Sequence, residues 1–145
     1  MKLKLLLPIL FVVYSCSQDA SIDRNDLIEE AGAPLLNGLG SHSFTISSKV
    51  EGVQDYFNQG LIMAFAFNHA ESIRSFKAAQ KLDPNCAICF WGEALALGPN
   101  INVTSDGKAI MSPQERLDAF ERTNKAMSLI AVSYTHLTLP TIYSV

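Results

Sequence analysis

The sequence predicts an all-α fold in which antiparallel helix pairs stack into an α-solenoid, and three observations support this. Tyr56-Phe-Asn-Gln-Gly60 recurs as Phe90-Trp-Gly-Glu-Ala94, and the offset of about 34 residues is typical of a two-helix solenoid unit. Apolar residues within these stretches follow three- and four-residue steps, as on one face of a helix. Prolines and capping residues lie between the periodic stretches and mark helix ends.

Length and composition limit the function classes. The chain has 145 residues, of which 48% are hydrophobic and 17% charged, as in a globular protein. Its formal net charge is −3 and it contains no basic run, so we expect no nucleic-acid partner. Three cysteines are too few for a disulfide scaffold.

Residues 1–16 read as an export signal. Lys2 and Lys4 precede a short apolar run, the pattern of a signal peptide, and about 20 apolar residues would be needed to span a bilayer. Val13-Tyr-Ser-Cys16 resembles a bacterial lipobox, in which Cys16 would carry the lipid. Tyr14 is bulky for that motif, so lipid anchoring and simple cleavage both stay open. Either way, we expect an exported, periplasmic protein.

Residues 17–48 are predicted to be a linker followed by an N-terminal extended segment. The first part is polar and acidic, and Gly32–Gly40 holds three glycines and a proline. From His42 to Ile46 polar and apolar residues alternate. This alternation predicts a short extended piece that packs Phe44 and Ile46 against the first long helix.

Residues 49–84 are predicted to form the first helical hairpin, with helices at about 49–66 and 70–82. Gly60 lies inside the first helix, where glycine costs about 1 kcal/mol relative to alanine. We therefore expect the backbone of another helix to approach it closely. Asp83 and Pro84 suit the N-cap and the first position of the next helix.

Residues 85–131 are predicted to form a second, irregular hairpin with an inserted loop. Its first helix, beginning at Pro84, should end near Leu97. Ser112-Pro-Gln-Glu115 has the pattern of a capping box, and it should start a final helix that ends near Leu129. The expected inward-facing residues of that helix are Leu117, Phe120, Thr123 or Asn124, Met127 and Ile130.

Residues 132–145 show neither helical periodicity nor caps. They can be written as DNA that resembles the read-through of a sequencing-library adapter, although a genuine polar strand is the other interpretation. We expect this tail to be non-native, as an expression scar would be. On that reading the natural protein continues, and its remaining repeats are missing from this sequence.

The unit from Val53 to Pro84 is similar to a tetratricopeptide repeat. Its departures are Gln59 where the motif has leucine and Phe67 where it has glycine. Phrases such as Phe90-Trp-Gly-Glu-Ala-Leu-Ala-Leu-Gly-Pro-Asn resemble long exported bacterial proteins with these repeats. The resemblance implies an α-solenoid that binds protein segments on its concave face and has no catalytic residues. The positions that carry it are Tyr56, Gly60, Met63, Ser72, Phe76, Ala79, Pro84, Phe90 and Ala94.

Cys86 and Cys89 form a Cys-x-x-Cys in the first turn of a predicted helix. Helix N-terminal amides lower a thiol pKa, so a thiol-redox or metal-binding function is the alternative hypothesis. A redox motif of this type normally follows a strand, and a zinc site needs two more ligands, for which His69 is the nearby candidate. The favoured interpretation is packing at the repeat junction, including a local disulfide in the oxidising periplasm.

Two other features could carry function but are better read as structural. His69 is expected to be a packed, hydrogen-bonded histidine. The aromatic residues are expected to be core, except that Phe65 and Trp91 lie off the main stripe and could line a groove. The sequence therefore predicts a non-enzymatic exported scaffold that binds proteins or peptides, without cofactor or metal.

Overall fold

The computed structural model describes residues 23–102, 104–105 and 108–130. The predictions for the export signal, for Cys16 and for the tail at 132–145 lie outside the described residues. Within them the chain forms five helices and one hairpin of two-residue strands. The prediction of an all-α fold is confirmed.

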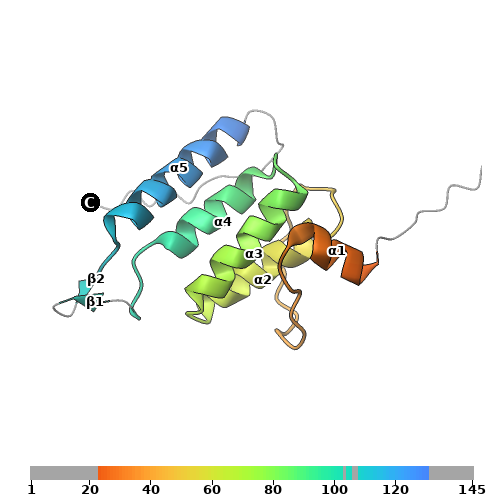
Figure 1. Cartoon of the computed structure of the whole chain (residues 1–145), viewed down its shortest axis with the longest axis horizontal. Helices are drawn as coiled ribbons and strands as arrows, with labels where there is room; N and C mark the ends of the chain where they lie inside the picture. The colour runs from red at the N-terminus through yellow and green to blue at the C-terminus, as the bar shows by residue number, and fades with distance from the viewer. Residues whose placement is uncertain (1–22, 103, 106–107, 131–145) are drawn as a thin grey trace, which may run out of the picture.

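The helices pack mainly against their neighbours along the chain. Figure 1 shows α3 between α2 and α4, with α5 on the far side of α4. The short antiparallel strands β1 (Thr104–Ser105) and β2 (Lys108–Ala109) lie in the connection predicted as a loop. The helices are α1 (Arg24–Ala31), α2 (Val53–Phe65), α3 (His69–Leu82), α4 (Ala87–Leu97) and α5 (Pro113–Ile130).

Helix α1 was not predicted, because residues 17–48 read as linker and extended segment. The Asp23 carboxylate caps it by accepting a hydrogen bond from the Asn25 amide at 2.7 Å. Gly32, with a φ of 73°, ends it in the left-handed conformation that glycine adopts readily. Leu27 and Ala31, one turn apart, are its buried residues. Two apolar positions in an acidic stretch are too weak a periodic signal to reveal a helix.

Helix α2 begins at Val53 rather than at the predicted residue 49. Gly52 precedes it with a φ of 79°, which stops the helix from extending toward the N-terminus. A Cβ atom at Gly52 would lie 2.5 Å from the Leu27 side chain. The glycine therefore sets the start of α2 and leaves room for α1.

The junction between α3 and α4 also differs from the prediction. Asp83 is the residue that follows α3, and Cys86, not Asp83, is the N-cap of α4. The Asp83 carboxylate accepts the Asn85 amide at 2.9 Å, and its carbonyl accepts the Cys86 amide at 3.1 Å. These bonds make a turn of residues 83–86, so the helix cannot start at Pro84.

Phe76 of α3 is the centre of the core. It is fully buried, and a Cβ atom placed on Gly60 of α2 or on Gly92 of α4 would lie 2.8 Å or 2.4 Å from its ring. The close approach predicted at Gly60 is therefore made by an aromatic ring and not by a helix backbone. Glycine on both flanking helices lets the ring fill the space between them.

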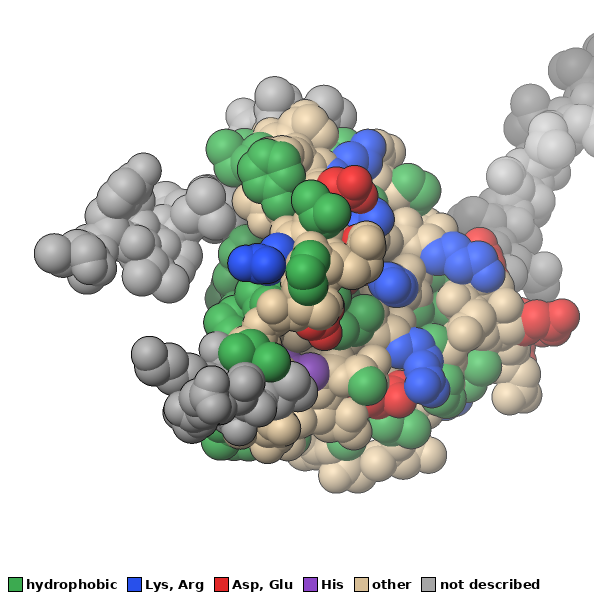
Figure 2. Space-filling model, turned by 60° about the vertical axis from the view of Figure 1, so that its left-hand side comes forward, with side chains coloured by type: hydrophobic (Ala, Val, Ile, Leu, Met, Phe, Trp, Pro, Cys, Tyr) green, Lys and Arg blue, Asp and Glu red, His purple; other side chains and the backbone are tan. Residues whose placement is uncertain are grey.

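Helix α5 faces its neighbour with a different side from the predicted one. Leu117, Phe120 and Met127 are between 53% and 65% exposed, whereas Ala126 and Leu129 are buried against α4. Figure 2 shows hydrophobic side chains at the surface on the side of the molecule that lies at the left of Figure 1. Leu117, Phe120 and Met127 of the predicted stripe therefore point away from the core, whereas Ile130 is partly buried and packs against it as predicted.

The start of α5 agrees with the predicted capping box. The Ser112 hydroxyl accepts the Glu115 amide at 3.1 Å, and the Glu115 carboxylate accepts the Ser112 amide at 2.7 Å. These bonds lower the pKa of Glu115. In the described residues, no helix combines the length and the apolar character that crossing a membrane requires.

Candidate peptide-binding face of α2

Three side-chain amides of α2 hold the backbone of the N-terminal segment, residues 33–46. They belong to Gln54, Asn58 and Gln59, which lie on the side of α2 that this segment covers. A side-chain amide offers both a donor and an acceptor. It can therefore satisfy backbone groups of a segment that has no strand or helix partner.

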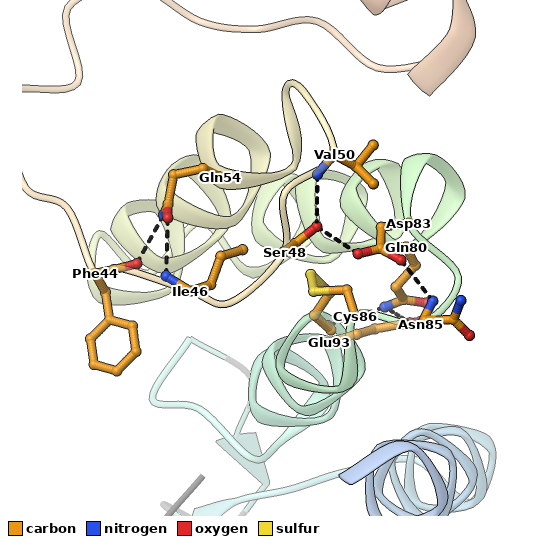
Figure 3. Close-up of a disulfide and its surroundings, with 11 residues drawn as sticks. Phe44, Ile46, Ser48, Val50, Gln54, Gln80, Asp83, Asn85, Cys86 and Glu93 are labelled. Carbon is orange, nitrogen blue, oxygen red and sulfur yellow. Dashed lines mark hydrogen bonds between the residues drawn. A yellow bond between two sulfur atoms is a disulfide. The ribbon is translucent and has the colours of Figure 1, made fainter. Parts of the chain in front are cut away.

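Gln54 binds the segment at two points. Its Nε2 donates to the carbonyl of Phe44 at 2.9 Å, and its Oε1 accepts the amide of Ile46 at 3.0 Å (Figure 3). The carbonyl of one residue and the amide two residues later are the groups that a neighbouring β-strand would also bind. Gln54 therefore takes the place of one residue of a partner strand.

Gln59 makes the same pair of bonds further along the segment. Its Nε2 donates to the Pro34 carbonyl at 3.0 Å, and its Oε1 accepts the Leu36 amide at 2.7 Å. It is 3% exposed and also donates to the Ser75 hydroxyl of α3 at 2.9 Å. Nearby, the Tyr56 hydroxyl donates to the Ala33 carbonyl. Burial raises the pKa of Tyr56, with a smaller opposing effect of the Arg24 charge.

Asn58 lies between these two glutamines and joins α2 to the segment. Its Oδ1 accepts the Phe44 amide at 3.1 Å and the Gln54 Nε2 at 3.0 Å, and its Nδ2 donates to the Ser43 hydroxyl at 3.1 Å. Phe44 therefore has both its amide and its carbonyl bonded to α2. The segment is fixed in register on the helix at this point.

The side chains of residues 44–46 alternate between the helix and solvent. Ile46 is buried, Thr45 is exposed, and the Phe44 ring is 6.1 Å from the Phe57 ring of α2, centroid to centroid. The predicted packing of Phe44 and Ile46 against the first long helix is confirmed, although Phe44 keeps about half of its surface in solvent. Backbone bonds and alternate side chains together fix this contact.

A cavity of about 330 Å³ lies between α2 and the part of the segment that arches away from it. Asp55 and His42 line it, and neither side chain makes a hydrogen bond or ion pair within the described part of the chain. Gly38 and Gly40 in the arch have positive φ angles and open space around them. The cavity is therefore bounded on one side by a loop that is open at these glycines, while Arg24 of α1 binds the Leu35 carbonyl and the Asn37 side chain just before them. Its other lining residues include Leu35, Leu36, Leu39, Asn58, Gln59 and Ile62.

Most of the residues that resemble the repeat motif lie in the contacts between helices, although Tyr56 also binds the N-terminal segment at Ala33. Ser72 is buried and donates to the Gly60 carbonyl at 2.6 Å, which ties α3 to α2. Pro84 is exposed in the junction and Ala94 is half-buried. The buried members are Tyr56, Gly60, Met63, Ser72, Phe76, Ala79 and Phe90.

Glu93 forms a second buried polar cluster, which sequence reasoning did not single out. It is 2% exposed on α4 and accepts a hydrogen bond from the Gln80 Nε2 of α3 at 2.7 Å. Lys77 Nζ lies 3.6 Å from one of its oxygens and Arg122 Nε of α5 lies 3.7 Å from the other. The sequence did offer one signal for Glu93. It holds the same position in the stretch of residues 90–94 as Gln59 holds in the similar stretch of residues 56–60.

Cys86 and Cys89 are joined by a disulfide at the start of α4. Both cysteines are buried, so neither sulfur is a free thiol at the surface. His69 is on another helix, and no group of three or more metal-ligating side chains occurs among the described residues. The pair therefore ties the N-cap of α4 to its first turn.

His69 is packed as predicted. Its Nδ1 lies 3.1 Å from the Ala96 carbonyl of α4, and because a carbonyl only accepts, Nδ1 carries the proton. Phe65 and Phe67, near the same end of the bundle, are exposed, and Phe67 has a φ of 59°. Trp91 is only partly buried and packs against the core. The left-handed Phe67 occupies the position where the repeat motif has glycine.

Comparisons of the chain with protein-family models, with curated proteins and with solved structures found no match.

Proposed function

We propose that this protein is an exported helical-repeat scaffold of the tetratricopeptide type, which binds protein or peptide segments and is not an enzyme. The observation that carries the proposal is the row of amides on α2. Gln54 and Gln59 each bind a carbonyl and an amide two residues apart. Contacts of this kind recognise extended backbone whatever its side chains are.

Corresponding polar contacts in the two helix pairs support the repeat interpretation. Gln59 of α2 bonds Ser75 of α3, and Glu93 of α4 pairs with Arg122 of α5. Gln59 and Glu93 are at the same place in the two copies, whereas Arg122 lies further along its copy because the α4–α5 connection is the longer one. The same place in each pair is thus used to join its two helices.

The outer face of α5 supports continuation of the stack. When Arg122 of α5 is aligned with Ser75 of α3, Phe120 and Met127 correspond to Ile73 and Gln80. Gln80 contacts α4 through Glu93 and the Cys89 carbonyl. The exposed stripe of α5 is therefore the counterpart of the α3 face that the next helix covers, and a further repeat would cover it.

The predicted export signal of residues 1–16 adds a periplasmic localisation to the proposal. Signal-type residues before Cys16 direct the chain out of the cytoplasm. A lipid on Cys16 would tether the helical domain to a bacterial membrane, with an affinity set by the acyl chains. Mass spectrometry of the mature protein distinguishes a lipidated N-terminus from a simply cleaved one.

The binding function is tested with the purified chain on an array of short overlapping peptides. We expect some peptides to bind with dissociation constants of about 100 µM or tighter, near −5.5 kcal/mol, and to protect α2–α5 amides from hydrogen exchange. Dissociation constants of about 1 mM or weaker for every peptide, roughly −4 kcal/mol, would contradict the proposal. Insulin-reducing activity lost in Cys86→Ser would favour the thiol-redox alternative instead.

A further inference from the structure

The contact between Gln54 and residues 44–46 combines backbone hydrogen bonds with one buried anchor side chain, Ile46, as the contact of a bound extended peptide would. Phe44 is half-exposed, and a Cβ atom added at Gly38 or Gly40 in the arch before it would have no neighbour within 4 Å. Within the segment, the backbone of residues 44–46 is held on α2 by hydrogen bonds to side chains, two at Gln54 and one at Asn58. No regular secondary structure fixes it.

We propose that the Gln54–Asn58 face of α2 is a binding site for an extended polypeptide with an aromatic residue and, two positions later, a branched aliphatic residue. Residues 44–46 occupy this site in the free protein and compete with a partner for it. This inference rests on the proposed peptide-binding function and names the ligand class.

The aromatic and aliphatic requirement follows from the geometry of the occupant. In an extended chain, alternate side chains point to the same side, and here Phe44 and Ile46 face α2 while Thr45 faces solvent. Ile46 fills a buried site, and Phe44 lies against the Phe57 ring. The middle residue is free to vary, since its side chain touches nothing that selects it.

The open cavity gives a longer ligand room to continue. The occupant runs opposite to α2, with Ile46 at Gln54 and Ser43 at Asn58. Residues that precede the aromatic position of a partner would therefore pass over Asn58 toward the cavity. Asp55 and His42 line that space and could accept polar groups there.

Competition from the protein's own segment should hide this site from weak ligands. A tethered occupant acts at an effective concentration on the order of millimolar when its connection is short. The connection here is short, since residues 47–52 alone separate Ile46 from the first residue of α2. A partner with equal contacts would therefore bind weakly until the resident segment is loosened.

The experiment uses a fluorescein-labelled peptide with the sequence of residues 43–47, Ser-Phe-Thr-Ile-Ser, and measures fluorescence anisotropy with the full chain. Ile46→Ser in the protein weakens the resident segment and changes no residue of α2. We expect this variant to bind the peptide about tenfold more tightly than the unaltered chain. Phe44→Ser, a substitution of a half-exposed residue, serves as the second variant in case Ile46→Ser impairs folding.

The receptor side is tested by adding Gln54→Met to the Ile46→Ser chain. Methionine keeps the shape of glutamine but offers no amide, so the gained binding should be lost. Gln114→Met, which removes an exposed amide on α5, is the matched control and should leave the gain unchanged. A labelled peptide with both Phe and Ile replaced by Ser should not bind.

Two results overturn the inference. One is a folded Ile46→Ser or Phe44→Ser chain that binds the peptide no better than the unaltered chain. The other is binding that Gln54→Met leaves unchanged, which places the peptide elsewhere. In both cases the array could still yield ligands, so the scaffold function would survive. If the array yields none while this peptide binds as expected, the general scaffold function fails and the α2 site stands.

Discussion

The first helices of the two pairs, α2 and α4, use the same buried position in different ways. Gln59 in α2 and Glu93 in α4 hold the fourth place of the repeated five-residue stretch, and both are almost fully buried. The amide of Gln59 meets backbone groups of the N-terminal segment, which need both a donor and an acceptor. The carboxylate of Glu93 accepts a hydrogen bond from Gln80 and forms ion pairs with Lys77 and Arg122.

The difference indicates that the element packed against this buried position decides whether the position carries an amide, as in Gln59, or a carboxylate, as in Glu93. On α4 that element is helix α3, whose long side chains bring positive charge. On α2 it is a segment with unpaired backbone. A buried polar group has to match its partners, because an unmatched one costs about 1–3 kcal/mol, more if charged. Substitutions in the two helices test this difference, in decreasing order of expected effect.

Removing the carboxylate should have the largest effect. Glu93→Ala removes the buried partner of Lys77 and Arg122, leaves Arg122 with only the exposed Glu121 among the described residues, and opens a space in the core, so we expect a loss of about 3 kcal/mol in unfolding free energy. Gln59→Ala removes neutral hydrogen bonds and should cost less, about 2 kcal/mol. Urea denaturation measures both. Glu121→Ala, which removes only the exposed partner of Arg122, is the control, and a loss as large there would refute the comparison.

The two glycines that flank Phe76 should respond in the order of their crowding. A Cβ atom would lie 2.4 Å from the ring at Gly92 and 2.8 Å at Gly60. Overpacking costs about 1–3 kcal/mol, and replacing glycine inside a helix returns about 1 kcal/mol. We therefore expect Gly92→Ala to be clearly destabilising and Gly60→Ala to be less so, in thermal melts. The reverse order would show that Phe76 is not held between them.

Tyr56 and Phe90 are the aromatic residues at the start of each copy, and they differ by one hydroxyl. Tyr56→Phe removes the bond to the Ala33 carbonyl and should cost about 1 kcal/mol at neutral pH. The folded-state pKa of Tyr56 is raised above its ordinary value of 10.0, so this stabilisation is present below pH 10 and is lost as the pH rises through the folded-state value. The difference in unfolding free energy between the unaltered protein and Tyr56→Phe, measured by chemical denaturation, should therefore shrink as the pH rises through the folded-state pKa of Tyr56. A difference that does not change with pH would contradict this account.

The smallest difference in stability is expected for substitutions at the C-terminal ends of α2 and α4. Phe67 follows α2 with a φ of 59°, whereas Gly98 follows α4 with a φ of −61°. The left-handed conformation costs a residue with a side chain about 1–2 kcal/mol. Phe67→Gly should therefore be up to about 1 kcal/mol more stable than Phe67→Ala, by urea denaturation. Equal stability of the two variants would show that this turn stores no strain.

Periodicity and capping patterns were sufficient to predict much of this fold from the sequence. The apolar stripe from Val53 identified α2, and Ser112 with Glu115 identified the start of α5, because both signals are local. Helix α1 escaped notice since only Leu27 and Ala31 carry its apolar face. A stripe also does not tell which neighbour it meets, so the Leu117 and Phe120 side of α5 was assigned to the core.

The candidate site was less predictable, because its contacts join residues far apart in the chain. The alternation of residues 42–46 revealed that Phe44 and Ile46 pack on α2. The role of Gln59 was not visible, since a polar residue at a usually apolar position reads as a weaker motif match. Its partners at Pro34 and Leu36 belong to a distant part of the sequence. Glu93 was hidden for the same reason.

The N-terminal segment takes up, on α2, the place that α3 takes up on α4. Gln59 meets Pro34 and Leu36 there, as Glu93 meets Gln80. In the proposed stack, the N-terminal segment covers α2, and the outer stripe of α5 is exposed among the described residues, so units would be added beyond α5. Such an assembly has a fixed polarity. The number of helix pairs can vary only at the C-terminal end, and each added pair is oriented by the pair before it, starting from α2 and α3.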